Sequence, residues 1–384
     1  MIYLDNAATS FPKPKPVYSA IERTMKKQGG SPSRASHKLA NAATEAVYSC
    51  RQAAGEFFGC EAESVVLTFN ATHALNLAIK GLCEAGSHIL ISDMEHNSVL
   101  RPVHALTVTK NCSYDVYPSC GGDADAVIEG IKSKLRPDTR MLVANHASNI
   151  CGIRLPIERI GEFCREHDII FIVDLSQSAG HIPVNVSSLK ADAVCMSGHK
   201  GLFGPQGTGL LILPGNRSIE TLVEGGSGVD STSPDMPHSL PERLEAGTYS
   251  APLAAGLAAG IKWLQKTGIE TVASHERRLS SLLCEYLDDM KGVTVFDREH
   301  VSAGGTVLFS VDGMSPAAVG KILDDCEICV RSGLHCAPLA HKCLKTGEDG
   351  AVRVSFSYFN TVSDVRQLAL SLHCITDCYD TIDS

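Results

Sequence analysis

The chain has 384 residues, of which 44% are hydrophobic, and its formal net charge at pH 7 is −9. A chain of this length can bury a large core and is long for a single domain, so we expect two domains. Its acidic balance, without any basic run interleaved with aromatic residues, argues against a nucleic-acid partner.

The sequence also argues against a membrane or a metal partner. No stretch of 18 uninterrupted apolar residues occurs, and Met1–Asn6 lacks the basic start of a signal peptide. The 15 cysteines are odd in number and scattered, which favours reduced thiols and a cytoplasmic location. The one CxxC pair, Cys326 and Cys329, has no second pair at metal-ligand spacing, so we predict no metal site.

Hydrophobic periodicity predicts alternating helices and strands in the first half of the chain. The helices are predicted at 38–58, 72–83, 123–134 and 156–167, and the strands at 64–69, 87–91, 140–146 and 169–174. Such alternation predicts an α/β fold with a parallel sheet flanked by helices. Residues 210–213 follow Lys200 with too little chain for a helical crossover, so we expect them to pair antiparallel.

The second half of the chain has a different pattern. It predicts a long loop at 225–241, two long helices within 252–290, strands near 292–296, 305–311, 328–331 and 351–355, and a final helix near 362–376. We therefore expect a large α/β domain at residues 15–255 and a small α+β domain formed by residues 1–14 and 256–384.

Lys200 and Asp174 are the first candidate site residues. Lys200 follows an apolar run within Ser197-Gly-His-Lys200, and Asp174 closes another apolar run. The carboxyl ends of neighbouring parallel strands face one crevice, where an amine can hold an aldehyde cofactor as a Schiff base and a carboxylate can keep a pyridine nitrogen protonated. These groups predict pyridoxal 5′-phosphate. The alternative is a surface lysine beside a flexible loop and an unrelated aspartate.

The segment Thr68–Asn76 predicts a phosphate site, because a strand, a polar turn and an amphipathic helix follow one another there. Backbone donors of Ala71 and Thr72 would hold the phosphate at the start of the helix. The alternative is that Thr72 only caps its helix, and the two interpretations are compatible.

Three further polar residues follow predicted strands. His96 follows the strand at 87–91 and could lie flat on a cofactor ring, although a lone histidine is more often a polar loop residue. Asn149 and Gln177 could hydrogen-bond the phenolic oxygen of the cofactor.

Cys336 lies in a short loop after a predicted strand, within Arg331-Ser-Gly-Leu-His-Cys336-Ala-Pro338. Cationic neighbours such as Arg331 and His335 favour the thiolate form of a cysteine, which is the form that attacks sulfur. The alternative is a buried core cysteine. Arg353 stands in an apolar strand-like run and suits a substrate carboxylate, with a buried structural ion pair as the alternative.

The motifs together resemble the class V aminotransferase family of fold-type-I pyridoxal phosphate enzymes, and within it the cysteine desulfurases and selenocysteine lyases. The resemblance spans nearly the whole chain, and the short cysteine loop is similar to the group II type. It is carried by Tyr3–Thr9, Arg34–His37, Glu95–Ser98, Ser148–Gly152, Asp174–Gln177, Ser197–Lys200, Glu245–Thr248, Arg331–Cys336 and Arg353.

This resemblance implies a large domain with a mostly parallel seven-stranded sheet and a small domain that carries the cysteine loop. It implies that Lys200 holds the cofactor aldehyde, that Asp174 pairs with the pyridine nitrogen and that His96 stacks on the ring. The remaining implied contacts are Asn149 and Gln177 with the phenolic oxygen, Ala71, Thr72, Ser197 and His199 with the phosphate, and Arg353, Arg331, Asn149 and His37 with the substrate.

Thr248 resembles the residue that this family lends to the phosphate site of the neighbouring subunit, which implies a homodimer with shared active sites. The chain departs from the family pattern at Ala71-Thr72-His73-Ala74, where one hydroxyl of the phosphate site is missing, and at Pro338, which follows the cysteine one residue early.

The resemblance implies a cysteine desulfurase that converts L-cysteine to L-alanine and transfers the sulfur to Cys336 as a persulfide, with a possible sulfur-acceptor protein as partner. A selenocysteine lyase and a cysteine sulfinate lyase are compatible with the same loop. A class V aminotransferase or racemase would need Lys200 but not Cys336. From another class, a non-catalytic protein could retain the cofactor only for stability.

Overall fold

A seven-stranded sheet forms the centre of the larger part of the molecule. The computed structural model describes residues 1–33, 36–215, 217–303 and 305–380, so Arg34 and Ala35 of the quoted motif lie outside it. The strand order is β2-β8-β7-β6-β5-β3-β4. Only β8 runs antiparallel to its neighbours, and the other pairs are parallel. The predicted α/β fold with a mostly parallel sheet is confirmed.

The elements predicted in the first half of the chain are present with ends that shift by at most one residue. The final helix, predicted at 362–376, continues to Asp380. The strands of the large sheet are β2 (Val65–Thr68), β3 (His88–Ser92), β4 (Ser113–Tyr117), β5 (Thr139–Asn145), β6 (Ile170–Asp174), β7 (Ala193–Ser197) and β8 (Gly209–Ile212). The predicted helices correspond to α2 (Lys38–Phe58), α3 (Ala71–Leu82), α5 (Ala124–Lys134) and α6 (Ile157–Glu166).

Both faces of this sheet are buried along its inner strands, which explains why most of these strands are largely apolar runs, whereas the edge strand β4 is only half-buried. Along β6, Phe171 and Val173 pack against one core with α2, α5, α6 and α7 (Ala251–Thr267). Ile170 and Ile172 point to the opposite core, with α3 and α4 (Asn97–Thr109). Successive side chains along a strand therefore point alternately to the two helical layers that cover the sheet.

Some elements of the large part had no prediction. They include β4, α4 and α1 (Lys15–Lys27), which packs on α7. The signal of α4 is weak because Pro102 lies inside it and several of its residues are β-branched. Burial of its Val99, Val103 and Leu106 stabilises the helix nevertheless.

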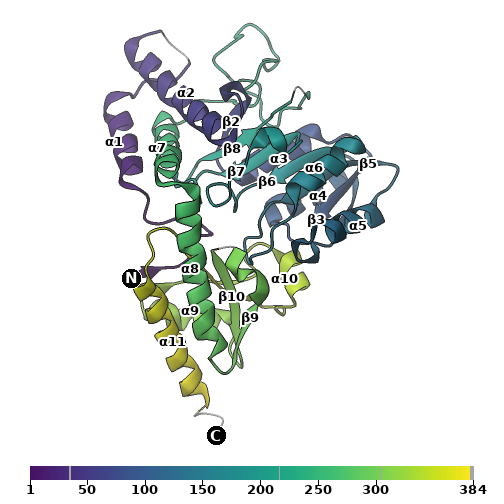
Figure 1. The fold of residues 1–384 in the computed structure, drawn as a ribbon. Coiled ribbons are helices and arrows are strands. Elements are labelled where there is room, and N and C mark those ends of the chain that lie inside the picture. Colours follow the sequence, from purple (N-terminus) through teal and green to yellow (C-terminus); the bar gives the residue numbers. More distant parts are fainter. Residues whose placement is uncertain (34–35, 216, 304, 381–384) are drawn as a thin grey trace.

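The smaller part is built on a four-stranded antiparallel sheet with the order β12-β13-β10-β9. Its strands are β9 (Val293–Phe296), β10 (Thr306–Val311), β12 (Arg331–Gly333) and β13 (Ala351–Ser355), and α8 (Ile269–Asp288), α9 (Pro316–Asp325) and α11 (Val362–Asp380) pack against them. Figure 1 shows α8 running from α7, beside the large sheet, to β9 and β10.

The single strand predicted at 328–331 is wrong, because the chain changes partners at Val330. Before it, β11 (Ile328–Cys329) pairs in parallel with β1 (Ile2–Tyr3), and after it β12 pairs antiparallel with β13. The first residues of the chain thus lie beside the smaller sheet. The division into residues 15–255 and the two flanking segments stays a prediction.

The segment 225–241 contains no helix or strand, as predicted, and a buried ion pair fastens the chain just beyond it. Both guanidinium nitrogens of Arg51 donate to Glu245, at 2.7 and 2.6 Å. The same carboxylate accepts from the backbone N–H of Leu67, and Arg51 also donates to the carbonyl of Val65. Glu245 is thereby fixed to β2 and α2.

We predict that Arg51→Met destabilises the protein strongly, because it leaves the Glu245 carboxylate buried without its cation. The expected loss in the free energy of unfolding is about 3–5 kcal/mol, measured by urea denaturation. Arg159→Met is the matched control, since its pair with Asp125 is exposed and should contribute less than about 1 kcal/mol. Equal losses in the two variants would contradict this account.

Candidate active site

The carboxyl ends of the parallel strands of the large sheet open onto one cleft with a volume of about 290 Å³. Most of the predicted site residues line it. These are Ala71, Thr72, His96, Asn149, Asp174, Gln177, Ser197, His199, Lys200, Arg331, Cys336 and Arg353. Polar residues from both sheets therefore converge on a single space, as expected for the edge of an open α/β sheet.

Lys200 lies in the turn that follows β7, and its strand is the parallel neighbour of β6, which ends at Asp174. Gly201 packs closely on the segment that follows β6, because an added Cβ at this position would lie 2.4 Å from the carbonyl oxygen of Ala179. Burial lowers the pKa of Lys200 to about 8, although the Asp174 carboxylate opposes the shift. The amine is therefore partly neutral and nucleophilic near neutral pH.

Asp174 is buried at the end of β6, and Ser176 holds its side chain. The backbone N–H and the hydroxyl of Ser176 both donate to Oδ1, at 2.8 and 2.5 Å. These bonds leave Oδ2 for a donor in the cleft. Burial raises the pKa of Asp174, while the Ser176 bonds and the charge of Lys200 act in the opposite direction.

His96 caps the start of α4, and its hydrogen bonds fix the proton on the ring. Nδ1 accepts from the backbone N–H of Ser98 at 3.0 Å and lies 2.8 Å from the Ser98 hydroxyl. The neutral ring therefore carries its proton on Nε2. Burial and nearby cations, Lys200 first among them, lower the pKa of His96 to about 4, so the ring is uncharged at neutral pH.

The start of α3 provides an anion site. Asn70 caps the helix by accepting from His73 N at 2.9 Å, so the interpretation of Thr72 as the cap is wrong. Ala71 and Thr72 occupy the first helical positions, whose N–H groups have no acceptor within the helix. A backbone donor needs no side chain, so the missing hydroxyl at Ala71 leaves this part of the site intact.

Ser197, the last residue of β7, and His199, just beyond it, line the same cleft as this helix start. The Nδ1 atom of His199 is buried and has no hydrogen-bond partner in the described part of the chain. Burial lowers the pKa of this ring to about 4. The neutral ring can therefore still hydrogen-bond a group that enters the cleft.

Asn149 and Gln177 each use one amide hydrogen within the protein. Asn149 Nδ2 donates to the backbone oxygen of His335 at 2.9 Å, and Gln177 Nε2 donates to the backbone oxygen of Ala7 at 3.0 Å. Each NH₂ group retains a second hydrogen. The Oδ1 atom of Asn149 is buried and has no partner among the described residues.

The loop that carries Cys336 is anchored at both sides of the cleft. The backbone oxygen of Cys336 accepts from Asn97 N, at the start of α4, at 2.7 Å. The Sγ atom lies 3.6 Å from a guanidinium nitrogen of Arg331. Cys336 is exposed, so it is not a core cysteine. Pro338 begins α10 (Pro338–Leu344), and its early position places the loop directly before that helix.

Arg353 is almost completely buried on β13, and the structural ion pair that was the alternative interpretation is present. One guanidinium nitrogen donates to Asp5 Oδ1 at 2.6 Å, and the other donates to the backbone oxygen of Asn149 at 2.9 Å. An ion pair is therefore present. The guanidinium also lines the cleft, and its buried Nε has no partner in the described structure.

Two predicted residues do not line this cleft. His37 caps α2, where its Nδ1 accepts from Ala40 N at 3.3 Å. Thr248 is exposed in the chain before α7. The interpretation of His37 as a substrate contact has no support within one subunit.

Three residues that were not predicted hold the predicted ones in place, namely Asn70, Ser98 and Ser176. Ser98 and Ser176 each stand two positions after the side chain that they hold. Short polar side chains at this spacing are typical of caps and turns, so the signal was present in the sequence.

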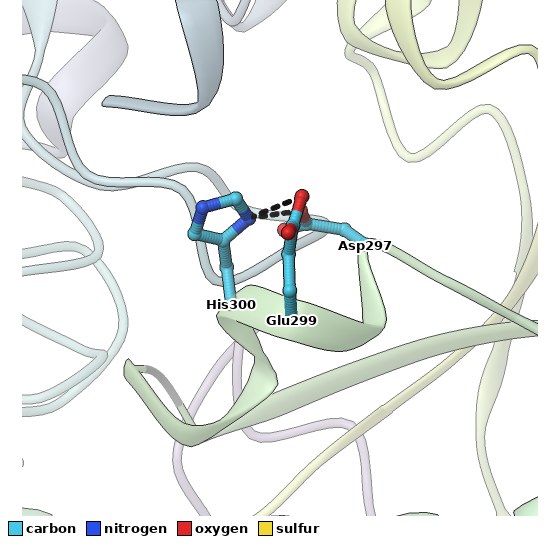
Figure 2. A group of neighbouring side chains, drawn as sticks. All are labelled: Asp297, Glu299 and His300. Atoms are coloured by element: carbon cyan, nitrogen blue, oxygen red, sulfur yellow. Dashed lines mark hydrogen bonds and ion pairs between the residues drawn. The ribbon is translucent and has the colours of Figure 1, made fainter. Parts of the chain in front are cut away.

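A second polar cluster lies away from the cleft, at η4 (Arg298–Ala303) (Figure 2). The ligand atoms of Asp297, Glu299 and His300 all lie within 4.8 Å of one another. Asp297 bonds His300 Nδ1 at 2.5 Å and accepts from Gly152 N at 3.1 Å. Glu299 is exposed. These bonds hold η4 against the segment at Gly152, so we assign the cluster a structural role.

In the described parts of the chain, every helix is too short or too polar to span a bilayer. The sequence model of the aminotransferase class-V family matches residues 2–368. A probable cysteine desulfurase of Pyrococcus abyssi is 33% identical over 380 residues, which cover 95% of this chain and 92% of that protein.

Solved structures give a similar result. The apo structure of a cysteine desulfurase from Thermococcus onnurineus NA1 has a TM-score of 0.90 and 32% identity, covering 98% of this chain and 94% of that chain. The S-sulfonic acid form of a cysteine desulfurase from Escherichia coli has a TM-score of 0.87 and 25% identity, and the match covers 98% of this chain and 94% of that chain.

The lowered pKa of Lys200 predicts how its reaction with a small aldehyde depends on pH. Only the neutral amine attacks a carbonyl, so the rate should rise with pH and level off above about 8. Asp174→Asn removes a charge that raises this pKa, so the plateau should begin at lower pH. Mass spectrometry of the Lys200 peptide after borohydride reduction measures the rate.

An exposed lysine of the same protein, such as Lys342, serves as the internal control for this measurement, because it lacks the burial that makes Lys200 reactive. A Lys200 profile that matches the profile of Lys342 would contradict the account.

Proposed function

This chain belongs to the aminotransferase class-V family, and we propose that it acts as a pyridoxal 5′-phosphate-dependent cysteine desulfurase. It would convert L-cysteine to L-alanine and take the sulfur onto Cys336 as a persulfide. The observation that carries this proposal is that Lys200 and Cys336 line the same cleft. An aminotransferase needs the lysine but has no use for a thiol there.

The residues present fit pyridoxal phosphate, which enzymes of this family use. The phosphate would bind the start of α3 at Ala71 and Thr72, with Ser197 and His199 beside it. The pyridine nitrogen would face Asp174. Each of these contacts matches a donor or acceptor that the protein leaves open, such as the unpartnered Nδ1 of His199.

The aldehyde end and the ring face also have partners. Lys200 would hold the aldehyde, and the neutral ring of His96 would cover the face of the pyridine. The second amide hydrogens of Asn149 and Gln177 would reach the phenolic oxygen. When bound, the cofactor supplies an aldehyde that joins amines and a ring that takes up the electron pair released at the substrate Cα.

Arg353 would bind the substrate carboxylate. Asp5 and Asn149 fix the guanidinium and use one hydrogen on each terminal nitrogen, and the Nε–H remains free. A fork that is already oriented loses little freedom when it binds a carboxylate. Arg331 adds a second positive charge at the same end of the cleft, beside Cys336 Sγ.

Two groups of the chain would carry the reaction. Lys200, as a neutral amine, would accept the proton from the substrate Cα, and its lowered pKa suits this role. The Cys336 thiolate would form a bond with the substrate sulfur while the Cβ–S bond breaks. The carbon fragment would then regain protons and leave as alanine. Because Cys336 is exposed, an acceptor protein could approach its persulfide.

We further propose a homodimer in which Thr248 completes the phosphate site of the partner. Thr248 is exposed, and its neighbour Tyr249 stacks on Phe69 with ring centroids 6.0 Å apart. Phe69 directly precedes the phosphate-binding helix start and is 57% exposed. An exposed aromatic ring beside an anion site suits a surface that a second subunit covers.

We predict that Cys336→Ser abolishes alanine formation from L-cysteine, with a loss of roughly 100-fold or more, because a hydroxyl cannot take up the sulfur. Binding of the cofactor at Lys200, followed by absorbance, should remain. Cys326→Ser replaces another exposed cysteine and should keep wild-type turnover. Alanine is measured by chromatography.

The same assay separates the alternatives. Turnover of selenocysteine or cysteine sulfinate but not of cysteine would identify a lyase for that substrate. Transamination that survives Cys336→Ser would identify an aminotransferase. A cofactor-loaded protein that forms no alanine from any of these substrates would refute the proposed function and favour a non-catalytic role.

A further inference from the structure

The loop that carries Cys336 is connected to a series of hydrogen-bonded side chains outside the proposed cofactor contacts, and two of them are buried histidines. His335, directly before the cysteine, and His341, on α10, are 3% and 2% exposed. His335 Nδ1 lies 3.0 Å from His341 Nε2, and the two rings are nearly parallel. His341 Nδ1 lies 2.7 Å from the hydroxyl of Thr346, just beyond α10.

The positions of the hydrogen atoms in this hydrogen-bond chain can be assigned by starting from His335. His335 Nε2 lies 3.0 Å from the backbone oxygen of Arg331, which can only accept, so Nε2 carries the proton. The neutral ring then accepts at Nδ1 from His341 Nε2–H. His341 in turn accepts at Nδ1 from the Thr346 hydroxyl. Every nitrogen of both rings is therefore satisfied in one arrangement.

The charge state of the two rings is consistent with that arrangement. Burial and the charge of Arg353 lower the pKa of His335 to about 3, and the same two causes lower that of His341 to about 4. Both rings are neutral at neutral pH, so the prediction that His335 is a cationic neighbour of Cys336 is wrong, because burial disfavours the charged ring. A proton on both nitrogens of His335 would break the one-directional chain.

The backbone explains why the loop needs such support. His335 and Cys336 both have positive φ, at 50° and 58°, a conformation that side chains other than glycine rarely adopt. Two consecutive residues of this kind persist only where the surroundings fix them. Asn149 and Asn97 fix the two backbone oxygens from the large part of the molecule. The imidazole chain fixes the His335 side chain from α10.

We propose that His335, His341 and Thr346 are positioning residues, whose hydrogen-bond chain holds the left-handed backbone at Cys336 and so keeps Sγ over the cleft. Their role in catalysis rests on the proposed function, whereas their role in ordering the loop does not. Misplacing a reacting group by a small distance can lower a rate by roughly 100-fold. A chain that fixes Sγ therefore contributes to rate without touching the substrate.

The test compares His341→Leu with His341→Gln. The glutamine NH₂ can take the place of Nε2–H and donate to His335, whereas leucine cannot. Hydrogen exchange of the peptide that covers 331–340, in cofactor-free protein, reports loop order through the Ala337 amide, which donates to Leu334 O at 2.8 Å. We expect faster exchange in His341→Leu, by about tenfold, and near wild-type exchange in His341→Gln.

Turnover gives the second measurement. In His341→Leu, kcat for L-cysteine should fall by about tenfold or more while KM stays close to wild type, because Arg353 and Lys200 are unchanged. His341→Gln should restore most of kcat. Lys342→Leu, at an exposed position of the same helix, should match wild type in both measurements.

If His341→Leu does not fold, Thr346→Val and Thr346→Ser are a less disruptive pair of variants. We expect faster hydrogen exchange of the loop in Thr346→Val only, because Thr346→Ser keeps the hydroxyl that donates to His341. The proposal is overturned if leucine and glutamine at position 341 behave alike, or if loop exchange is unchanged in both His341→Leu and Thr346→Val. If the wild type forms no alanine, the proposed function fails while the exchange measurement still decides the role of the chain.

Discussion

The parallel direction of the strands is the constraint on which the site depends. Parallel strands end at the same edge of a sheet, so the residues that follow β3, β5, β6 and β7 must meet there. His96, Asn149 and Lys200 follow β3, β5 and β7, and Asp174 is the last residue of β6. The smaller sheet then supplies the other wall of the cleft, with Arg353 and the Cys336 loop. Residues that are distant in sequence thus act on one space.

Burial gives this space its chemical character. Lys200, Arg331 and Arg353 provide positive charge, while the histidines around them are held neutral by burial and by these same cations. A cleft with this balance favours a ligand that carries phosphate and carboxylate groups. The protein groups that remain open there, such as Arg353 Nε and Asn149 Oδ1, indicate a polar ligand as well.

Much of the fold could be predicted from the sequence, because the inner strands of the large sheet are buried on both faces and are largely apolar. Helix α4 could not be predicted, because Pro102 and its β-branched residues weaken the helical signal in the sequence, and the helix is stabilised by tertiary packing. The change of strand partner at Val330 could not be predicted either, because β11 pairs with β1 and this pairing joins residues more than 300 positions apart. Asp174, Lys200 and Cys336 could be predicted from local spacing alone. The pairing of Arg353 with Asp5 and the chain from His335 to Thr346 need the coordinates, since they join separate elements.

The central claim is that an amine at position 200 and a thiol at position 336 act on one bound amino acid. The most direct measurement is mass spectrometry of the wild-type, cofactor-loaded protein after brief exposure to L-cysteine without a reductant. The account predicts one additional sulfur atom on the peptide that contains Cys336, together with an equal amount of alanine. Alanine without sulfur on Cys336, or sulfur on another cysteine only, would contradict it.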